Sequence, residues 1–549
     1  MLQVTDLTIS FGNKKALEKV SFSIGNKEVV AVVGESGSGK SLCSLAVMKL
    51  LPNAAKVVEG EIRFGDLDLL AINEGVRGQK IAMIFQEPMT SLNPVFTCGE
   101  QITETILNNE KVTKKAAIDR SIGLLKQVKL ADPEKLYNKY PHELSGGQKQ
   151  RVMIAVAISC NPQLLIADEP TTALDVTVQK EVLELLKEIQ EEKGMSMLFI
   201  THDLPLVANI ASRVIVMKKG KIVEQGPVKE VFESPTDIYT KALLACKPPL
   251  DKRFVVLPTI EHFVDSTLGQ IEEISKEARR EAHNKIYSET PFLEVENLKV
   301  SYATEKNWFG KTTRKHVAVD DVSFQLFKGE SLGLIGESGC GKTSIGRALV
   351  QLISQEEGVI KYKDKKVSDY NREEMLSYRK DVQIIFQDPF ASLNPRKTIG
   401  SSILEPLTVH REGSESEFRE EVLELLEKVG LERENYFKYP HEFSGGQRQR
   451  ISIARTLVMQ PKIIICDESV SALDVSIQAQ VLNLLNDLKR EFGLTYIFIS
   501  HDLSVVKYFC DRMLVMNKKG KIEEEGECDL LYDHPKSDYT RALIQAIPK

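Results

Sequence analysis

The chain lacks any long uninterrupted run of apolar residues. A helix that crosses a lipid bilayer needs ~20 consecutive apolar residues, and no stretch of the 549 residues approaches that length. The amino-terminal stretch MLQVTDLTIS also lacks the basic region followed by a long apolar one that marks a secretory signal. We therefore expect a chain that does not cross a membrane by itself and is not secreted.

Clustered cysteine and an excess of basic charge are also missing. The 8 cysteines form no CxxC pair and no group with histidine, which argues against a disulfide framework or a structural metal site and favours free thiols in a reducing compartment. The 72 Lys and Arg residues stand against 78 Asp and Glu, a formal net charge of −6. This balance does not favour a protein that binds nucleic acid through an overall basic surface.

The chain contains one long sequence pattern that occurs twice. GESGSGKS at 34–41 returns as GESGCGKT at 336–343, and YPHELSGGQKQR at 140–151 returns as YPHEFSGGQRQR at 439–450. IADEPTTALDV and ITHDL return as ICDESVSALDV and ISHDL in the same order, each about 300 residues later. A chain of this length already predicts more than one domain, and the repeat predicts that two of them are copies.

We predict that the two copies occupy 1–247 and 291–549, with a linker over 248–290. The second copy carries an insertion at 306–315, KNWFGKTTRK, that the first copy lacks. Charged tips on strand connections are common, so a solvated hairpin is favoured there. The basic residues beside Trp308 leave contact with lipid headgroups or with a partner as the alternative.

Short apolar runs precede the repeated motifs. Glu28–Val33 leads into the first glycine loop, Leu164–Ala167 leads into Asp168, and Met197–Ile200 leads into His202. Uninterrupted apolar strands are typical of a parallel sheet covered on both faces, and apolar residues at helical spacing separate them. The fold class is therefore α/β, with polar residues at the carboxyl ends of strands, where such sheets bind ligands.

Both glycine loops match GxxxxGK[ST] between a predicted strand and a predicted helix. Glycines let backbone amides surround phosphates at the positive end of a helix, the lysine reaches the β and γ phosphates, and the final hydroxyl ligates Mg²⁺. A glycine turn without a ligand is the alternative, and two matches at equivalent positions argue against it. The predicted phosphate-binding residues are Gly34, Glu35, Ser36, Gly37, Ser38, Gly39, Lys40 and Ser41, and Gly336, Glu337, Ser338, Gly339, Cys340, Gly341, Lys342 and Thr343.

Two adjacent acidic residues follow an apolar strand in each copy. A buried carboxylate pair is costly unless a cation or a reaction uses it. We predict that the first acid holds Mg²⁺ through water and that the second polarises an attacking water. A histidine after the next strand, at the same spacing in both copies, is predicted to contact the γ-phosphate, although a lone histidine is more often structural. The magnesium-side acids are Asp168 and Asp467, and the catalytic residues are Glu169, His202, Glu468 and His501.

With these motifs in order, both copies resemble the ATP-binding cassette (ABC) ATPases almost end to end. LSGGQ at 144–148 and FSGGQ at 443–447 resemble the signature motif of that family, whereas alone they would indicate only a flexible turn before a helix. The resemblance implies two P-loop NTPase domains, each with a mostly parallel core sheet, an N-terminal antiparallel β part and a helical signature subdomain. It also implies ATP and Mg²⁺ as ligands and ATP hydrolysis as the activity.

In similar proteins two such modules face head to tail, so each ATP lies between the P-loop of one module and the signature of the other. The signature residues here are Ser145, Gly146, Gly147 and Gln148, and Ser444, Gly445, Gly446 and Gln447. Phe11 and Tyr302 resemble the aromatic residue that stacks on adenine, although an aromatic at a strand end often only packs.

Two further loops are assigned by the resemblance. Gln86 and Gln387 resemble the Q-loop, which senses Mg²⁺ and the γ-phosphate and contacts a transmembrane partner, while Asp175 and Asp474 resemble the D-loop, which communicates between modules. The implied metal set is Ser41, Gln86, Asp168, Thr343, Gln387 and Asp467.

A narrower resemblance lies in FQEPMTSLNP, in FQDPFASLNP and in the tails at 234–249 and 534–549. These resemble the oligopeptide/dipeptide/nickel branch of bacterial importers, in forms whose two ATP-binding subunits are fused. The implied role is peptide import at the cytoplasmic face of the cell membrane by one fused chain per transporter. It implies two transmembrane permease subunits and an extracytoplasmic solute-binding protein as partners, membrane contact only through the permeases, and no nucleic acid. The solute stays open among peptide, peptide antibiotic, nickel and glutathione, in that order.

Two other functions compete with import. A soluble tandem-cassette ATPase acting on ribosomes or nucleic acid would have a long basic linker, but acidic residues outnumber basic ones between Leu250 and Thr290. A cassette fused to an exporter would carry membrane spans on this chain. Neither is favoured.

Overall fold

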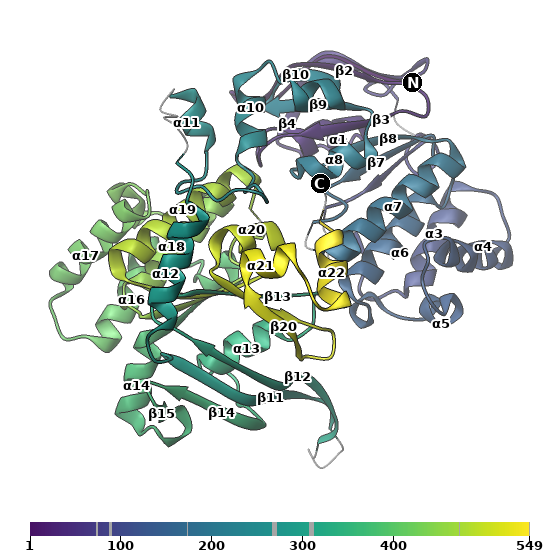
Figure 1. The fold of residues 1–549 in the computed structure, drawn as a ribbon. Coiled ribbons are helices and arrows are strands. Elements are labelled where there is room, and N and C mark those ends of the chain that lie inside the picture. The colour runs from purple at the N-terminus through teal and green to yellow at the C-terminus, as the bar shows by residue number, and fades with distance from the viewer. Residues whose placement is uncertain are drawn as a thin grey trace.

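The protein is described by a computed structural model that covers residues 1–72, 75–86, 91–172, 174–265, 272–306, 312–471 and 473–547. Two lobes with the same order of elements lie side by side, the first in purple to blue and the second in green to yellow (Figure 1). The end of the second lobe lies against the first, because Gln545, Ala546 and Ile547 share a pocket with helices α7 and α8 of that lobe.

The first lobe is built on a six-stranded sheet in the order β10-β9-β3-β8-β7-β6. All its neighbouring strands pair in parallel except β10 and β9. Every residue of β3 is buried, as expected for a strand covered on both faces. The strands are β3 Val29–Val33, β6 Ile81–Ile84, β7 Leu164–Asp168, β8 Ser196–Ile200, β9 Arg213–Lys218 and β10 Lys221–Pro227. The parallel α/β core predicted for this copy is therefore present.

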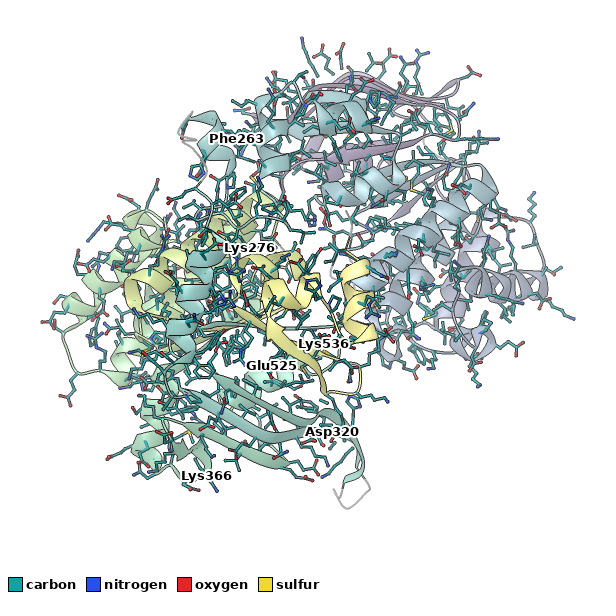
Figure 2. All side chains as sticks on the ribbon, viewed as in Figure 1. Phe263, Lys276, Asp320, Lys366, Glu525 and Lys536 are labelled. Carbon is teal, nitrogen blue, oxygen red and sulfur yellow. The ribbon has the colours of Figure 1, made fainter. Side chains whose placement is uncertain are left out.

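The second lobe repeats this sheet in the order β16-β17-β18-β13-β19-β20, again with one antiparallel edge strand. Its strands are β13 Ser331–Gly336, β16 Val382–Ile385, β17 Ile463–Asp467, β18 Thr495–Ser500, β19 Arg512–Met516 and β20 Ile522–Glu527. Figure 2 marks Glu525 on the β20 edge.

Each lobe also has a four-stranded antiparallel sheet, as the family resemblance implies. The strands are β1 Leu2–Phe11, β2 Lys14–Ile24, β4 Ala55–Phe64 and β5 Leu67–Asp68 in the first lobe, and β11 Leu293–Lys306, β12 Thr312–Leu326, β14 Glu357–Tyr362 and β15 Lys365–Lys366 in the second. The insertion at 306–315 falls at the end of the longer β11–β12 hairpin, and its residues 307–311 lie outside the described ones. Its predicted exposure stays a prediction.

Helices pack against the sheets through one apolar face. In α7 the buried residues include Val182, Leu185, Leu186 and Ile189, at the spacing predicted for a helix. The helices of the first lobe are α1 Lys40–Val47, α3 Cys98–Asn109, α4 Lys114–Gln127, α5 Pro133–Tyr137, η1 Pro141–Glu143, α6 Gly146–Ile158, α7 Val176–Lys193, α8 Leu204–Ile210, α9 Val228–Glu233 and α10 Ile238–Ala245.

The second lobe has the corresponding helices, and after its antiparallel sheet it has a turn and a helix that the described residues of the first lobe lack. They are α13 Lys342–Leu349, η2 Val367–Asp369, α14 Arg372–Asp381, α15 Pro389–Ser392, α16 Ile399–His410, α17 Glu415–Lys428, η3 Arg433–Phe437, η4 Pro440–Glu442, α18 Gly445–Leu457, α19 Val475–Phe492, α20 Leu503–Phe509, α21 Cys528–Asp533 and α22 Asp538–Gln545. In the ranges that the structure describes, no helix combines the length and the apolar character needed to cross a bilayer.

The segment between the lobes contains α11 (Ile260–Val264) and α12 (Lys276–Tyr287). Helix α12 lies across the second lobe (Figure 1), and Figure 2 marks Lys276 at its amino end. Arg279 pairs with Asp529 and also donates to the carbonyl of Cys510 at 3.2 Å. The segment is therefore folded onto the second lobe rather than extended away from it.

Removing this buried guanidinium should release α12. Arg279→Ala removes the donor to the Asp529 carboxylate and one of the two arginine donors to the Cys510 carbonyl, which Arg253 still contacts at 2.8 Å, at a cost of about 2 kcal/mol. We expect amide hydrogen exchange over α12 to become about 30-fold faster. Arg280→Ala, at an exposed position of the same helix, is the matched control. Unchanged exchange in the Arg279 variant would show that this contact does not hold the helix.

Candidate active sites

Each glycine loop connects a buried strand to a helix. The loop of the first lobe runs from the end of β3 to Lys40, where α1 begins, and the loop of the second lobe leads to Lys342 and α13. Gly39 and Gly341 both have φ of 101°, which favours glycine. A Cβ at Gly341 would also lie 2.2 Å from the carbonyl oxygen of Ala318 in β12. The glycines thus let each loop pass tightly beneath the neighbouring antiparallel sheet.

The two loop lysines are buried, and within the described part of the chain they are bonded only to atoms of their own loops. Lys40 Nζ donates to the carbonyls of Gly34 at 2.8 Å and Glu35 at 3.0 Å. Lys342 Nζ donates likewise to Gly336 at 2.7 Å and Glu337 at 2.9 Å. Among the described residues no carboxylate forms an ion pair with either ammonium. A buried cation without an anionic partner is the arrangement that a phosphate group would complete.

A hydroxyl and a carboxylate meet directly beside each lysine. Ser41 Oγ donates to Asp168 Oδ1 at 3.1 Å, and Thr343 Oγ1 donates to Asp467 Oδ1 at 2.9 Å. Burial raises the pKa of Asp168 to about 6 and also raises the pKa of Asp467. Oxygen donors whose charge is destabilised by burial fit a hard cation such as Mg²⁺, which would stabilise the ionised form. The residues present therefore fit the predicted metal.

Glu169 has three side-chain partners at the end of β7. Its carboxylate accepts from Gln86 Nε2 and Thr172 Oγ1, each at 2.9 Å, and lies 3.4 Å from His202 Nδ1. Burial alone raises the pKa of Glu169, but the hydrogen bond and charge of His202 and the charge of Lys40 outweigh it and lower the pKa to about 2. Its φ of 46° is uncommon for a residue other than glycine. The site thus holds an ionised carboxylate in a fixed orientation.

Glu468 repeats this arrangement with one difference. Its carboxylate accepts from Gln387 Nε2 at 2.8 Å and lies 3.6 Å from His501 Nδ1. Burial raises the pKa of Glu468, and His501 and Lys342 outweigh it, so the net shift is downward. The hydroxyl of Ser471, which corresponds to Thr172, donates to the backbone carbonyl of Glu468 instead of its carboxylate. The repeated motif shows the change from threonine to serine, but not the change of hydrogen-bond acceptor.

The two predicted adenine-stacking residues are partly open to solvent. Phe11, the last residue of β1, is 39% exposed, and Tyr302 in β11 is 38% exposed. The hydroxyl of Tyr302 lies 3.0 Å from Ser344 Oγ, directly after the glycine loop. Neither ring is buried in the core, which was the alternative, but stacking on adenine stays a prediction.

Both signature motifs begin a helix with a capping box. Ser145 Oγ accepts from Gln148 N at 3.3 Å, and Ser145 N donates to Gln148 Oε1 at 3.0 Å, an arrangement that Ser444 and Gln447 repeat. The second glycine has a packing role, because a Cβ at Gly147 would lie 2.7 Å from Val178. Gly146 and Gly445 are exposed. No hydrogen bond among the described residues joins a signature to the opposite glycine loop, so that pairing stays a prediction.

Contacts do cross between the lobes at the predicted D-loops. Asp474 Oδ2 of the second lobe accepts from Ser36 N in the first glycine loop at 2.8 Å. Asp175 Oδ2 of the first lobe accepts from Ser338 N in the second glycine loop at 3.4 Å. Each glycine loop is therefore held partly by the opposite copy.

One residue at the first loop was not predicted from its motifs. Tyr239 in α10 bonds through its hydroxyl to Glu35 N at 3.1 Å and to Glu35 Oε2 at 3.3 Å. The only signal in the sequence was the tail around it, which was noted for its family resemblance and not for a contact.

Comparison with known proteins agrees with the duplicated site. The family described as ABC transporter matches residues 17–172 and again 319–471. The family described as Oligopeptide/dipeptide transporter, C-terminal region, matches residues 223–268.

The chain is similar over its whole length to curated proteins. The Glutathione import ATP-binding protein GsiA of Escherichia coli O157:H7 is 45% identical over 562 residues, covering 100% of this chain and 89% of the relative. The protein of that name from Pectobacterium atrosepticum is 44% identical with the same coverage. A solved dimeric cassette of a bacterial ABC transporter is 28% identical, covers 43% of this chain and 98% of its own, and has a TM-score of 0.39.

The resemblance read from the motifs is thus confirmed in both halves of the chain. Because the family matches each copy and the relatives align from end to end, the protein belongs to the ATP-binding proteins of ABC transporters, which hydrolyse ATP to power transport, and it carries the C-terminal region of the oligopeptide/dipeptide transporters.

Proposed function

We propose that this protein is the ATP-hydrolysing subunit of an importer for small peptides, with two ATP sites in one chain. The observation that carries the proposal is the repetition of one complete site. In each lobe a buried lysine without an anionic partner, a hydroxyl bonded to an aspartate, and a glutamate held by glutamine and histidine lie around one glycine loop.

In the first lobe Lys40 and the loop amides would bind the β and γ phosphates of ATP, and Ser41 and Asp168 would hold Mg²⁺. When bound, Mg²⁺ supplies positive charge to the phosphate oxygens. Glu169 would accept the proton of a water whose oxygen attacks the γ phosphorus. The bond from that phosphorus to the β–γ bridging oxygen breaks, and ADP and phosphate result. Lys342, Thr343, Asp467 and Glu468 would do the same in the second lobe.

The histidine would control the strength of the base. Glu169 is ionised at neutral pH, but His202 makes it a weak base by lowering its pKa to about 2. A γ-phosphate that binds His202 would draw the imidazole away and make the carboxylate more basic. Hydrolysis would then depend on nucleotide being in place.

We propose that the two sites are composite. The contact between Asp474 and Ser36 supports this, because it brings the second lobe to the first glycine loop. Site one would combine Gly34–Ser41, Phe11, Gln86, Asp168, Glu169 and His202 with Ser444, Gly445, Gly446 and Gln447. Site two would combine Gly336–Thr343, Tyr302, Gln387, Asp467, Glu468 and His501 with Ser145, Gly146, Gly147 and Gln148. The cassettes would be 1–247 and 291–549, and 248–290 would connect them.

The permease partners of an ABC import system would dock near the Q-loops. In the second lobe Phe386, the residue before Gln387, lines a groove of about 460 Å³ between the core sheet and the helical segment. Arg379, His410 and Arg455 also line it, so an acidic or carbonyl-rich helix end of a permease fits there. We infer two permeases and a solute-binding protein for one chain, which would work at the cytoplasmic face of the cell membrane.

The proposed solute is a small peptide. The match to the oligopeptide/dipeptide transporter region supports a peptide, and the relatives named for glutathione import make this tripeptide the first one to test. No finding favours the alternative role on ribosomes or nucleic acid.

The two glutamates can be tested together. Glu169→Gln with Glu468→Gln removes both bases and retains hydrogen-bonding groups of the same size, so phosphate release should fall at least ~100-fold while ATP binding persists. Glu191→Gln, at an exposed position of α7, is the control and should hydrolyse at the wild-type rate. Undiminished turnover in the double variant would exclude these bases.

The loop lysine tests site one alone. Lys40→Ala removes the cation that would bind the phosphates, so turnover should fall to about half or lower, and the melting temperature should change little. Lys126→Ala, an exposed lysine of α4, is the control. A Lys40 variant with wild-type turnover would remove site one from the scheme.

Transport is tested by reconstituting this chain into proteoliposomes with the permeases and solute-binding protein that co-purify with it. We expect glutathione or trialanine uptake into proteoliposomes only with ATP, and faster ATP hydrolysis when solute and its binding protein are present. Co-sedimentation with ribosomes and no uptake of either peptide would contradict the importer. Uptake of nickel alone would retain the importer and overturn the peptide assignment.

A further inference from the structure

Helix α10 brings a buried tyrosine to the first glycine loop. Tyr239 is 1% exposed. Its hydroxyl accepts from Glu35 N at 3.1 Å and donates to Glu35 Oε2 at 3.3 Å, while Lys218 Nζ lies 4.7 Å from its ring centroid. One side chain therefore fixes both the backbone and the carboxylate of the second residue of the loop.

The helix that carries Tyr239 is itself held in place. Glu224 in β10 accepts from Thr236 N at 2.8 Å and from Asp237 N at 3.2 Å. Asp237 then caps the helix by accepting from Tyr239 N at 2.8 Å. The tyrosine is thus positioned by the edge of the core sheet and not by a free tail.

The second lobe has the same scaffold with a looser contact. Glu524 in β20 accepts from Lys536 N at 2.9 Å and from Ser537 N at 3.0 Å, and Figure 2 marks Lys536 just before α22. The corresponding hydroxyl, that of Tyr539, also faces the backbone and carboxylate of Glu337, but in the described part of the chain it forms no hydrogen bond as close as those of Tyr239. Glu337 instead forms an ion pair with Lys518 Nζ at 2.5 Å. A tyrosine restrains one loop glutamate, and a lysine neutralises the other.

This glutamate matters because it is a negative charge inside a loop that would bind a triphosphate. A carboxylate free to turn toward the phosphates would repel them. The next residue, Ser36, is already held by Asp474 of the second lobe. Adjacent loop residues are therefore fixed from two directions, Glu35 by its own lobe's C-terminal region and Ser36 by the opposite lobe.

We propose that Tyr239 is a positioning residue for ATP at site one, through which the C-terminal region matched over 223–268 sets the nucleotide affinity of that site. The inference rests on the proposed function of the loop. It makes the two sites unequal, because Glu35 is held by close hydrogen bonds from the hydroxyl of Tyr239, whereas Glu337 is held mainly by the ammonium of Lys518.

The nucleotide affinity of each site can be measured separately in the full chain. In a Lys342→Ala background, with only site one intact, Tyr239→Phe should raise the Kd for the fluorescent analogue mantATP with Mg²⁺ about fivefold, the effect of losing one net hydrogen bond. When Tyr239→Phe is the only substitution in the chain, the KM for ATP should rise and kcat should change less than about twofold. In a Lys40→Ala background, Tyr539→Phe should raise the Kd of site two less than about twofold, and Lys518→Met should raise it more.

A chain that carries Glu35→Gln distinguishes a positioning role of Tyr239 from a packing role. Glu35→Gln removes the repelling charge, so adding Tyr239→Phe there should change the Kd less than about twofold. An equal loss with and without the Glu35 charge would show a packing role and overturn the inference. Equal losses for Tyr239→Phe and Tyr539→Phe would overturn the asymmetry. If the Lys342→Ala chain binds mantATP and Tyr239→Phe has no effect, the inference alone fails, whereas a wild-type chain that binds no mantATP overturns the proposed function with it.

Discussion

The buried ammonium of the loop lysine is the interaction on which the other features of each site depend. Lys40 is 5% exposed and Lys342 is 4% exposed, and in the described part of the chain both donate only to atoms of their own glycine loop, namely backbone carbonyls and, for Lys342, also the sulfur of Cys340. Carbonyl oxygens offset part of the desolvation of a cation but leave its charge unpaired. The loop must therefore be rigid enough to hold the lysine until an anion arrives. Strand β3, the glycine at φ 101° and the overlying antiparallel sheet supply that rigidity.

The second constraint is that neither loop is complete within its own lobe. The hydrogen bond from Ser36 to Asp474 joins residues 438 positions apart in the chain, and the reciprocal contact to Asp175 is longer, at 3.4 Å. Fusion raises the effective concentration of the partner lobe, so this interface does not require two chains to meet. The connecting segment also contacts the second lobe, because Leu257 and Asn483 form two hydrogen bonds that hold the segment against α19.

The sequence predicted those parts of the site whose reactive residues lie close together in one short motif. The P-loop, the acidic pair and the histidine each follow an apolar strand at fixed spacing, so their position at the strand tips could be inferred before any fold was known. Tyr239 could not, because it meets Glu35 across 204 residues and its neighbours in sequence carry no recognisable chemistry. The packing role of Gly147 against Val178 was hidden for the same reason, since the motif assigned that glycine to ligand binding. Spacing identifies groups that act together on one strand or helix, whereas contacts between distant segments require the fold.

The duplication shows why identical motifs do not make identical sites. Glu169 and Glu468 have matching glutamine and histidine partners, yet only the first carboxylate also accepts from a threonine hydroxyl. An additional hydrogen bond stabilises the ionised form, so Glu169 should be the weaker base of the two. Beneath the loops, a tyrosine hydroxyl restrains Glu35 while an ammonium neutralises Glu337. The lysine, the acidic pair and the histidine are the same in both copies while some of their neighbours differ, and a difference in rate between the two sites would therefore arise in these neighbours.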